Sequence, residues 1–161
     1  MGRYNDDILI WSEHQGALLR RLAAGEMVNN AEFDWPNIAE EIESVGRSER
    51  AALASHIRTV LVHLIKLGVS PAAEPRANWM ESVINARAAI EDVLEASPSL
   101  RPTLSAVLAR QLPHARRLVV AALAAHGETP RIPPEQLQYS EDQVLGTWLP
   151  DAPQADRGVW S

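Results

Sequence analysis

The stretch Asp34–Leu67, DWPNIAEEIESVGRSERAALASHIRTVLVHLIKL, decides the fold of this chain. It opens with signals for a helix start. Asp34 can cap free backbone N–H groups, and Pro36 lies in the first turn, where its missing N–H costs nothing. Phe33 and Ile38 are placed to pack across that cap as a hydrophobic staple. The stretch therefore predicts a helix that begins just after Asp34.

Apolar residues recur through this stretch at steps of three and four, which places them on one helical face. A straight helix of this length would measure roughly 50 Å at 1.5 Å per residue. That exceeds the usual width of a domain of this size, whose radius of gyration is about 15 Å. We therefore expect a break or kink near Gly46, with Ser44 or Ser48 helping to cap a second helix. The half from residue 51 onward is the better core candidate because its apolar stripe is wide. The apolar positions are Ile38, Ile42, Val45, Ala52, Ile57, Val60, Leu61, Leu64 and Leu67.

The rest of the chain also predicts helices and no strands, because no segment alternates apolar and polar residues for long. Gly25, Gly68 and Gly127 are natural helix ends. We expect an all-α fold: a compact bundle of four to five main helices, a short C-terminal helix and an irregular tail. One domain should cover residues 1–150, followed by a polar tail over 151–161. The expected helices are Tyr4–Ala24, capped by Asn5 or Asp6; Ala77–Ala96; Leu100–His126, kinked or broken at Pro113; and a short one opened by a Ser140–Gln143 capping box.

Composition narrows the function classes. The chain has 161 residues, a formal net charge of −6 and no cysteine, which excludes disulfides and thiolate metal sites. The acidic balance argues against nucleic-acid binding, which usually needs a basic footprint. The basic residues are scattered, and only short pairs such as Arg116–Arg117 stand out. The first residues lack a secretory pattern, and no apolar run approaches the ~20 residues of a membrane span. We expect a cytoplasmic protein that does not enter a membrane.

Four motifs, in order along the chain, carry a resemblance to a family. They are Tyr4-Asn5-Asp6-Asp7 through Trp11; Asn37-Ile38-Ala39-Glu40-Glu41-Ile42-Glu43-Ser44-Val45-Gly46-Arg47-Ser48-Glu49-Arg50; Ser97-Pro98-Ser99-Leu100-Arg101; and Gln143-Val144-Leu145 with Trp148-Leu149-Pro150. The chain resembles the bacterial domain-of-unknown-function family twenty-nine from about Tyr4 to Pro150. The second motif is the specific one. The resemblance implies a small bacterial helical protein, and it implies no activity.

Charged residues at steps of three and four form the first candidate site. Glu40, Glu43, Arg47 and Arg50 fall on one helical face. Such a face is ordinarily a solvated one, with pairs worth ~0.3–0.5 kcal/mol each. The sharper interpretation is a partly buried charge network that receives a partner, with Ser44, Ser48 and Gly46 allowing close approach of another backbone. Trp148, beside the irregular C-terminal part, is a candidate anchor because tryptophan is enriched at binding hot spots.

His56, His63 and Glu49 form the metal candidate, and spacing argues against it. Seven residues rise about 10.5 Å along a helix, too far for two histidines to share one ion at ~2.0–2.2 Å. The Glu-x-x-His pair of di-iron bundles is missing. A metal site would need His14, His114 or His126 from other helices. We therefore expect no metal and no cofactor.

The sequence favours a non-catalytic module that binds a protein partner or itself. No Gly-x-Ser-x-Gly elbow or glycine-rich phosphate loop is present. The binding surface we expect is Glu40, Glu43, Arg47 and Arg50, with Trp148. Two alternatives stay open: a metal-dependent, hydrolase-like enzyme that uses His and Glu from separate helices, and a nucleic-acid-associated regulator that uses Arg116–Arg117.

Overall fold

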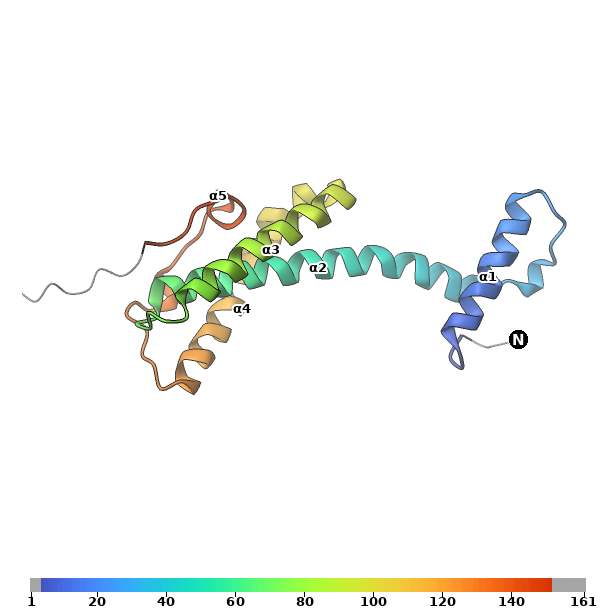
Figure 1. Ribbon diagram of the computed structural model, residues 1–161. Helices are drawn as coiled ribbons and strands as arrows, with labels where there is room; N and C mark the ends of the chain where they lie inside the picture. The colour runs from blue at the N-terminus through green and yellow to red at the C-terminus, as the bar shows by residue number, and fades with distance from the viewer. Residues whose placement is uncertain (1–3, 152–161) are drawn as a thin grey trace, which may run out of the picture. The chain divides into compact units, whose positions relative to one another are not determined.

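The computed structural model describes residues 4–151, and within them the chain is all-α, as predicted. Five α-helices are present, four of them long and the last one short (Figure 1). No residue between 4 and 151 lies in a β-strand. The polar tail predicted over 151–161 lies outside the described part, apart from Asp151. The elements are α1 (Ile8–Ala23), η1 (Asn30–Glu32), α2 (Trp35–Val69), α3 (Arg76–Ala96), η2 (Pro98–Thr103), α4 (Leu104–Ala125), η3 (Pro134–Gln136) and α5 (Glu141–Leu145).

The helices group into two compact units, Met1–Ser48 and Glu49–Ser161, which we call the first and the second unit. The first unit holds α1, η1 and the beginning of α2. The second holds the rest of α2 and every later element. The expectation of one domain over residues 1–150 stays a prediction.

The first unit has a small core in which each member follows from a local signal. Trp11 and Leu18 of α1 are buried with Phe33 and Ile38, the two residues predicted to staple the start of α2. α1 begins at Ile8, four residues after the expected start at Tyr4, because Asp7, not Asn5 or Asp6, caps it by accepting a hydrogen bond from the backbone N–H of Ile10. Gly25 follows its end with a φ of 79°, a left-handed conformation that favours glycine.

The second unit has a larger core of twenty buried apolar residues, contributed by α2, α3, η2, α4 and α5. The predicted stripe of α2 supplies its centre: Val60, Leu61, Leu64 and Leu67 have no exposed surface. Each fully buried side chain of this size contributes ~1.5–3 kcal/mol of transfer free energy. The prediction that the later half of the opening stretch forms the core is confirmed.

Of the two outcomes predicted near Gly46, the break is wrong, because α2 is one helix of 35 residues (Figure 1). The kink stays a prediction. Ser44 does not cap a new helix; its hydroxyl donates to the carbonyl of Glu41 within the same helix, at 2.7 Å. Arg47 adds ion pairs to residues on the preceding turns, which supports helix on both sides of Gly46. A helix of this length is possible because α2 is shared between the two units, with the unit boundary after Ser48.

At Pro113 the predicted alternative of a break is also wrong, since α4 runs through it, and the alternative of a kink stays a prediction. Proline removes one backbone hydrogen bond and crowds the preceding turn, at a cost of ~3 kcal/mol. The neighbouring side chains of Leu112, Ala115 and Val119 are buried, and their burial offsets that cost. The helix begins at Leu104 instead of Leu100, because residues 98–103 form the 3-10 turn η2.

Arginine side chains hold the C-terminal segment onto the second unit by binding backbone carbonyls. Arg87, which is buried, donates to the carbonyls of Gln143, Val144 and Trp148 at 2.7–2.9 Å. Arg116 donates to the carbonyl of Leu137 at 2.5 Å. The predicted capping box of α5, with Ser140 and Gln143 bonded reciprocally, is confirmed.

Candidate functional site

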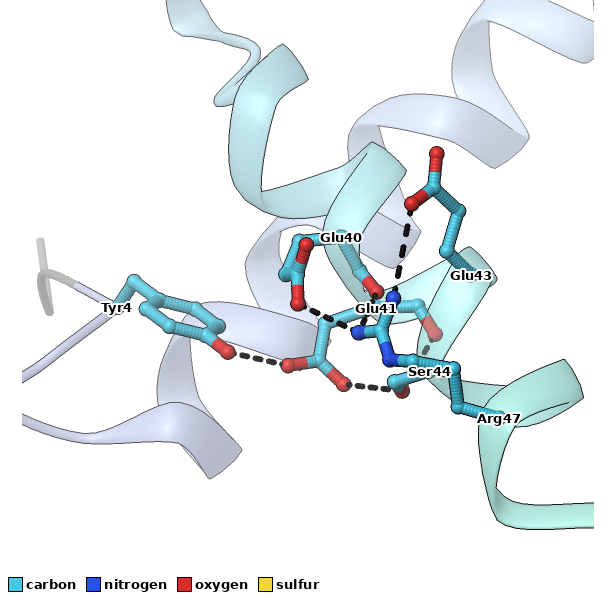
Figure 2. A network of polar contacts seen from close by, with 6 residues as sticks. All are labelled: Tyr4, Glu40, Glu41, Glu43, Ser44 and Arg47. Carbon is cyan, nitrogen blue, oxygen red and sulfur yellow. Dashed lines mark hydrogen bonds and ion pairs between the residues drawn. The ribbon is translucent and has the colours of Figure 1, made fainter. Parts of the chain in front are cut away.

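Three of the predicted binding residues meet on the part of α2 that belongs to the first unit. The guanidinium of Arg47 pairs with Glu40 at 2.5 Å and with Glu43 at 3.6 Å (Figure 2). The three side chains stay more than half exposed. Exposed pairs are screened by water and contribute little to stability. This ion-pair face is therefore a solvated surface on which one guanidinium pairs with two carboxylates, leaving a net charge of −1.

A second set of polar contacts lies beside the ion-pair face. The hydroxyl of Tyr4 donates to the carboxylate of Glu41, and the hydroxyl of Ser44 lies 3.4 Å from the other oxygen of that carboxylate (Figure 2). The hydrogen bond to Glu41 raises the pKa of Tyr4, with burial adding to it. Tyr4 precedes α1, so this contact fixes the chain entering α1 against α2.

Asp34 joins α1 to the start of α2. Its carboxylate accepts hydrogen bonds from the side chain of Asn37 at 2.8 Å and from the indole N–H of Trp11 at 3.1 Å. The bond from Asn37 is the main cause that lowers the pKa of Asp34. The buried side chain of Gln15 accepts from the backbone N–H of Asp34 at 2.9 Å. These residues and Tyr4 line an open cavity of about 660 Å³.

The sequence predicts Ile42 and Val45 in the apolar stripe of a core helix, yet both lie in water. Ile42 is 68% exposed and Val45 is 65% exposed, although Ile38, on the same stripe, is buried against α1. Trp35 continues the stripe at 41% exposure; its ring stacks on Phe33 and its N–H donates to Asn30. We call Trp35, Ile38, Ile42 and Val45 the apolar seam. At about 100° per residue, the seam lies opposite Glu40, Glu43 and Arg47 on the helix.

The other two predicted binding residues belong to the second unit. Arg50 lines a cavity there together with Arg110. Trp148 is 40% exposed, its ring centroid lies 6.2 Å from that of Tyr139, and its carbonyl accepts from Arg87. The prediction that all five residues form one binding surface stays a prediction.

The metal candidates do not gather into a ligand set. Among residues 4–151, no three His, Asp or Glu side chains lie close enough together to hold an ion. Glu49 accepts from the hydroxyl of Ser97 at 3.4 Å. The Nδ1 atom of His63 is buried without a hydrogen-bond partner, and burial lowers the pKa of this histidine. That environment suits a neutral imidazole. The expectation of no metal and no cofactor stays a prediction.

By length and composition α2 could cross a membrane, and within the described residues it is the one helix that could. The core helix of a globular protein passes the same test. Here 44% of the apolar window is buried inside the molecule. The expectation that the chain does not enter a membrane stays a prediction.

Sequence reasoning missed one grouping of charge. The basic residues look scattered along the chain, but cavities between α2 and α4 bring Arg50 to Arg110 and Arg58 to Arg117. A signal was available, because residues 50–73 and 98–127 contain no Asp or Glu at all. Pairing these two acid-free segments would have predicted a basic surface.

A family model described as "Domain of unknown function DUF29" matches residues 3–149. No curated protein and no solved structure matches the chain.

Proposed function

The chain belongs to the DUF29 family, and from that premise we propose that it is a non-catalytic protein-interaction module which associates with a second copy of itself through its first unit. One observation carries the proposal: eight of the thirteen large apolar side chains exposed in the described residues belong to the first unit. That unit buries only four. A unit of fewer than ~60 residues with a small core is marginal alone and is commonly stabilised by association.

The apolar seam has the geometry that a partner helix recognises. Its members, Trp35, Ile38, Ile42 and Val45, follow one another at steps of three, four and three, which is the a/d spacing of two heptads. Trp35 is held by its stack on Phe33 and by its bond to Asn30, so little side-chain entropy is lost when it is covered. Ile38 is already buried against α1, so Trp35, Ile42 and Val45 form the part of the seam that is open to a partner.

The residues that flank the seam favour a second copy as the partner. The e and g positions of these heptads are Ala39, Glu41, Gly46 and Ser48. Only Glu41 is charged, and Tyr4 already binds it. The positions beside the seam therefore add one carboxylate per copy, within a unit whose net charge is −5, and Ala39 and Gly46 let the two backbones come close. Glu40, Glu43 and Arg47 lie away from the seam, as the polar rim of such an interface does.

Sedimentation velocity over a range of protein concentrations tests this proposal. A seam of two heptads buries a small area, so the wild-type chain should dimerise with a Kd on the order of 10 µM. The double variant Ile42→Asp/Val45→Asp should stay monomeric, because each of the two copies would bury two added carboxylates in the interface. The matched control is Ile84→Asp, which places the same change on an exposed residue of α3 and should dimerise like the wild type. A wild-type chain that stays monomeric at about 200 µM would overturn the proposal.

A further inference from the structure

The second unit separates its charges by element. Residues 50–73 and 98–127 together carry seven basic residues and no acidic one. These segments form the later part of α2, η2 and α4. The acidic residues of the unit lie on α3 and after residue 127, apart from Glu49 and Glu74. The basic residues are Arg50, Arg58, Lys66, Arg101, Arg110, Arg116 and Arg117.

Four of these arginines line two cavities where α2 and α4 meet, which we call the basic groove. The first cavity, of about 200 Å³, has Arg50 and Arg110 above an apolar floor that includes Leu53, Leu100 and Val107. The second, of about 410 Å³, is lined by Arg58, His114, Arg117 and Leu118. Residues 110, 114 and 117 recur at helical spacing, so they share one face of α4.

Among residues 4–151 none of these four guanidinium groups forms an ion pair within 4 Å, and every such pair joins residues of the first unit. Glu135 is the acidic residue that shares a cavity with one of them, Arg117. Arg58 donates to the side-chain oxygen of Gln111 at 3.3 Å, and Arg117 to the imidazole of His114 at 3.1 Å. Both acceptors are uncharged when they accept, so the contacts orient the arginines and leave their charge free to attract an anion.

The dimensions of the groove fit a short peptide. Arg50 and Arg58 are separated by about 12 Å along α2, the span of about four residues of an extended chain. Guanidinium groups bind carboxylates in a bidentate manner. The apolar floor of the first cavity can receive one apolar side chain placed between acidic ones.

A nucleic acid fits the groove less well. The residues that line the two cavities include no Phe, Tyr or Trp, and the one imidazole, of His114, is already bonded to Arg117, so bases would find little surface on which to stack. An apolar floor beside the arginines offers nothing to a phosphate. Single-stranded binding sites also cover ~4–16 nucleotides, which is longer than this row of arginines.

We propose that the basic groove binds a short acidic peptide segment of a partner protein. Carboxylates of the segment pair with Arg50, Arg58, Arg110 and Arg117, and one apolar side chain of the segment packs on Leu53, Leu100 and Val107. This surface lies entirely within the second unit and is separate from the apolar seam, so the proposal stands apart from self-association.

Fluorescence anisotropy with labelled probe peptides tests the proposal. The probe is a seven-residue peptide that alternates Glu and Asp around a central Leu. Two matched peptides replace the acidic residues by Gln and Asn, or the central Leu by Gly. At low salt we expect binding of the acidic probe, a loss of about tenfold or more without its carboxylates, a smaller loss without its Leu, and weaker binding as salt rises.

Charge-reversed variants locate the site. Arg50→Glu and Arg110→Glu, both on exposed residues, should each weaken binding of the acidic probe about tenfold. Arg131→Glu makes the same charge change on an exposed arginine outside the acid-free segments and should stay within about twofold. Circular dichroism checks that each variant is folded. The seam variant Ile42→Asp/Val45→Asp should bind the probe like the wild type, whatever its oligomeric state.

Three outcomes would overturn the proposal. The first is no binding of the acidic probe at low salt. The second is an equal loss in Arg131→Glu, which would mean attraction by net charge without a site. The third is tighter binding of a single-stranded oligonucleotide of matched charge, which would assign the groove to nucleic acid instead.

Discussion

The first and second units of this chain are held together by different means. The first buries four large apolar residues, exposes eight, and contains all three ion pairs found in residues 4–151. The second buries twenty apolar residues and uses arginines to bind backbone carbonyls. The sequence charge differs as well: residues 1–48 have nine acidic and four basic residues, a net charge of −5, whereas residues 49–161 have twelve and eleven, a net charge of −1.

This difference shows that one helix can form the core of one unit and present an exposed apolar face in the other. The same spacing of apolar residues continues along α2, yet Leu61 is fully buried and Ile42 is mostly exposed. Burial is the main source of stability, and ion pairs in water add little. The second unit should therefore carry most of the folding free energy, and the first should be the part that gains from a partner.

The largest expected effect comes from the core of the second unit. Leu61→Ala removes a fully buried side chain and should lower the free energy of unfolding by ~3–5 kcal/mol. Chemical denaturation followed by circular dichroism measures the loss. The control is Leu9→Ala, on an exposed residue of α1, which should cost less than ~0.5 kcal/mol. A similar cost for the two variants would contradict the assignment of stability to the second unit.

How much of this division could be predicted depends on which signals are local. Asp34 and the Ser140–Gln143 box predicted helix starts correctly, and the stripe from Ile57 to Leu67 predicted the core, because capping and periodicity are properties of neighbouring residues. Periodicity says which residues share a face, but it does not say whether anything covers that face. The wider stripe favoured the half from residue 51 onward as core, but periodicity alone could not show that Ile42 and Val45 are left uncovered.

Predicting the candidate site requires contacts between residues that are distant in the sequence, even more than predicting the fold does. The pairing of Arg47 with Glu40 and Glu43 follows from helical spacing and was predictable. The contacts of Arg87 with residues 143, 144 and 148 cross more than fifty positions of the chain and leave no local pattern. The basic groove required knowing that α2 and α4 lie side by side.

The next largest effect tests how the second unit uses arginine. Arg87→Met removes every donor to three carbonyls, one of them in a fully buried contact. Hydrogen bonds from a charged group contribute ~1.5–3 kcal/mol, so we expect a loss of about 2–3 kcal/mol and faster amide exchange over residues 137–149. Arg87→Lys, which keeps the charge but not the fork of donors, should recover only part of the loss. Unchanged exchange in that segment would show that the arginine does not hold it.

A smaller, stabilising change tests whether the first unit is marginal. Gly16 lies inside α1, and a Cβ there would meet only the flexible end of Arg20, at 3.8 Å. Gly16→Ala should stabilise the first unit by ~0.5–1 kcal/mol, seen as slower amide exchange over residues 8–23. The opposite control is Gly146→Ala, whose Cβ would lie 2.6 Å from the carbonyl oxygen of Asp142 and should destabilise α5. If Gly16→Ala leaves amide exchange in α1 unchanged, the stability of α1 is not what limits the stability of the first unit.

The smallest expected effect is a pH dependence confined to the second unit. Burial lowers the pKa of His63 below its usual 6.5, and the nearby charge of Lys66 adds to the shift. The unfolded chain therefore takes up a proton at this histidine at a higher pH than the folded chain does. Stability is complete above pH 6.5 and falls as the pH drops from 6.5 toward the lowered pKa. His63→Gln should flatten that dependence, as measured by urea denaturation between pH 7 and pH 5. His126, whose side chain is exposed, provides the control substitution His126→Gln, which should leave the dependence as it is. If the free energy of unfolding still falls with acid in His63→Gln, the loss arises from protonation of carboxylates. The carboxylates of the acidic first unit would then be tested next.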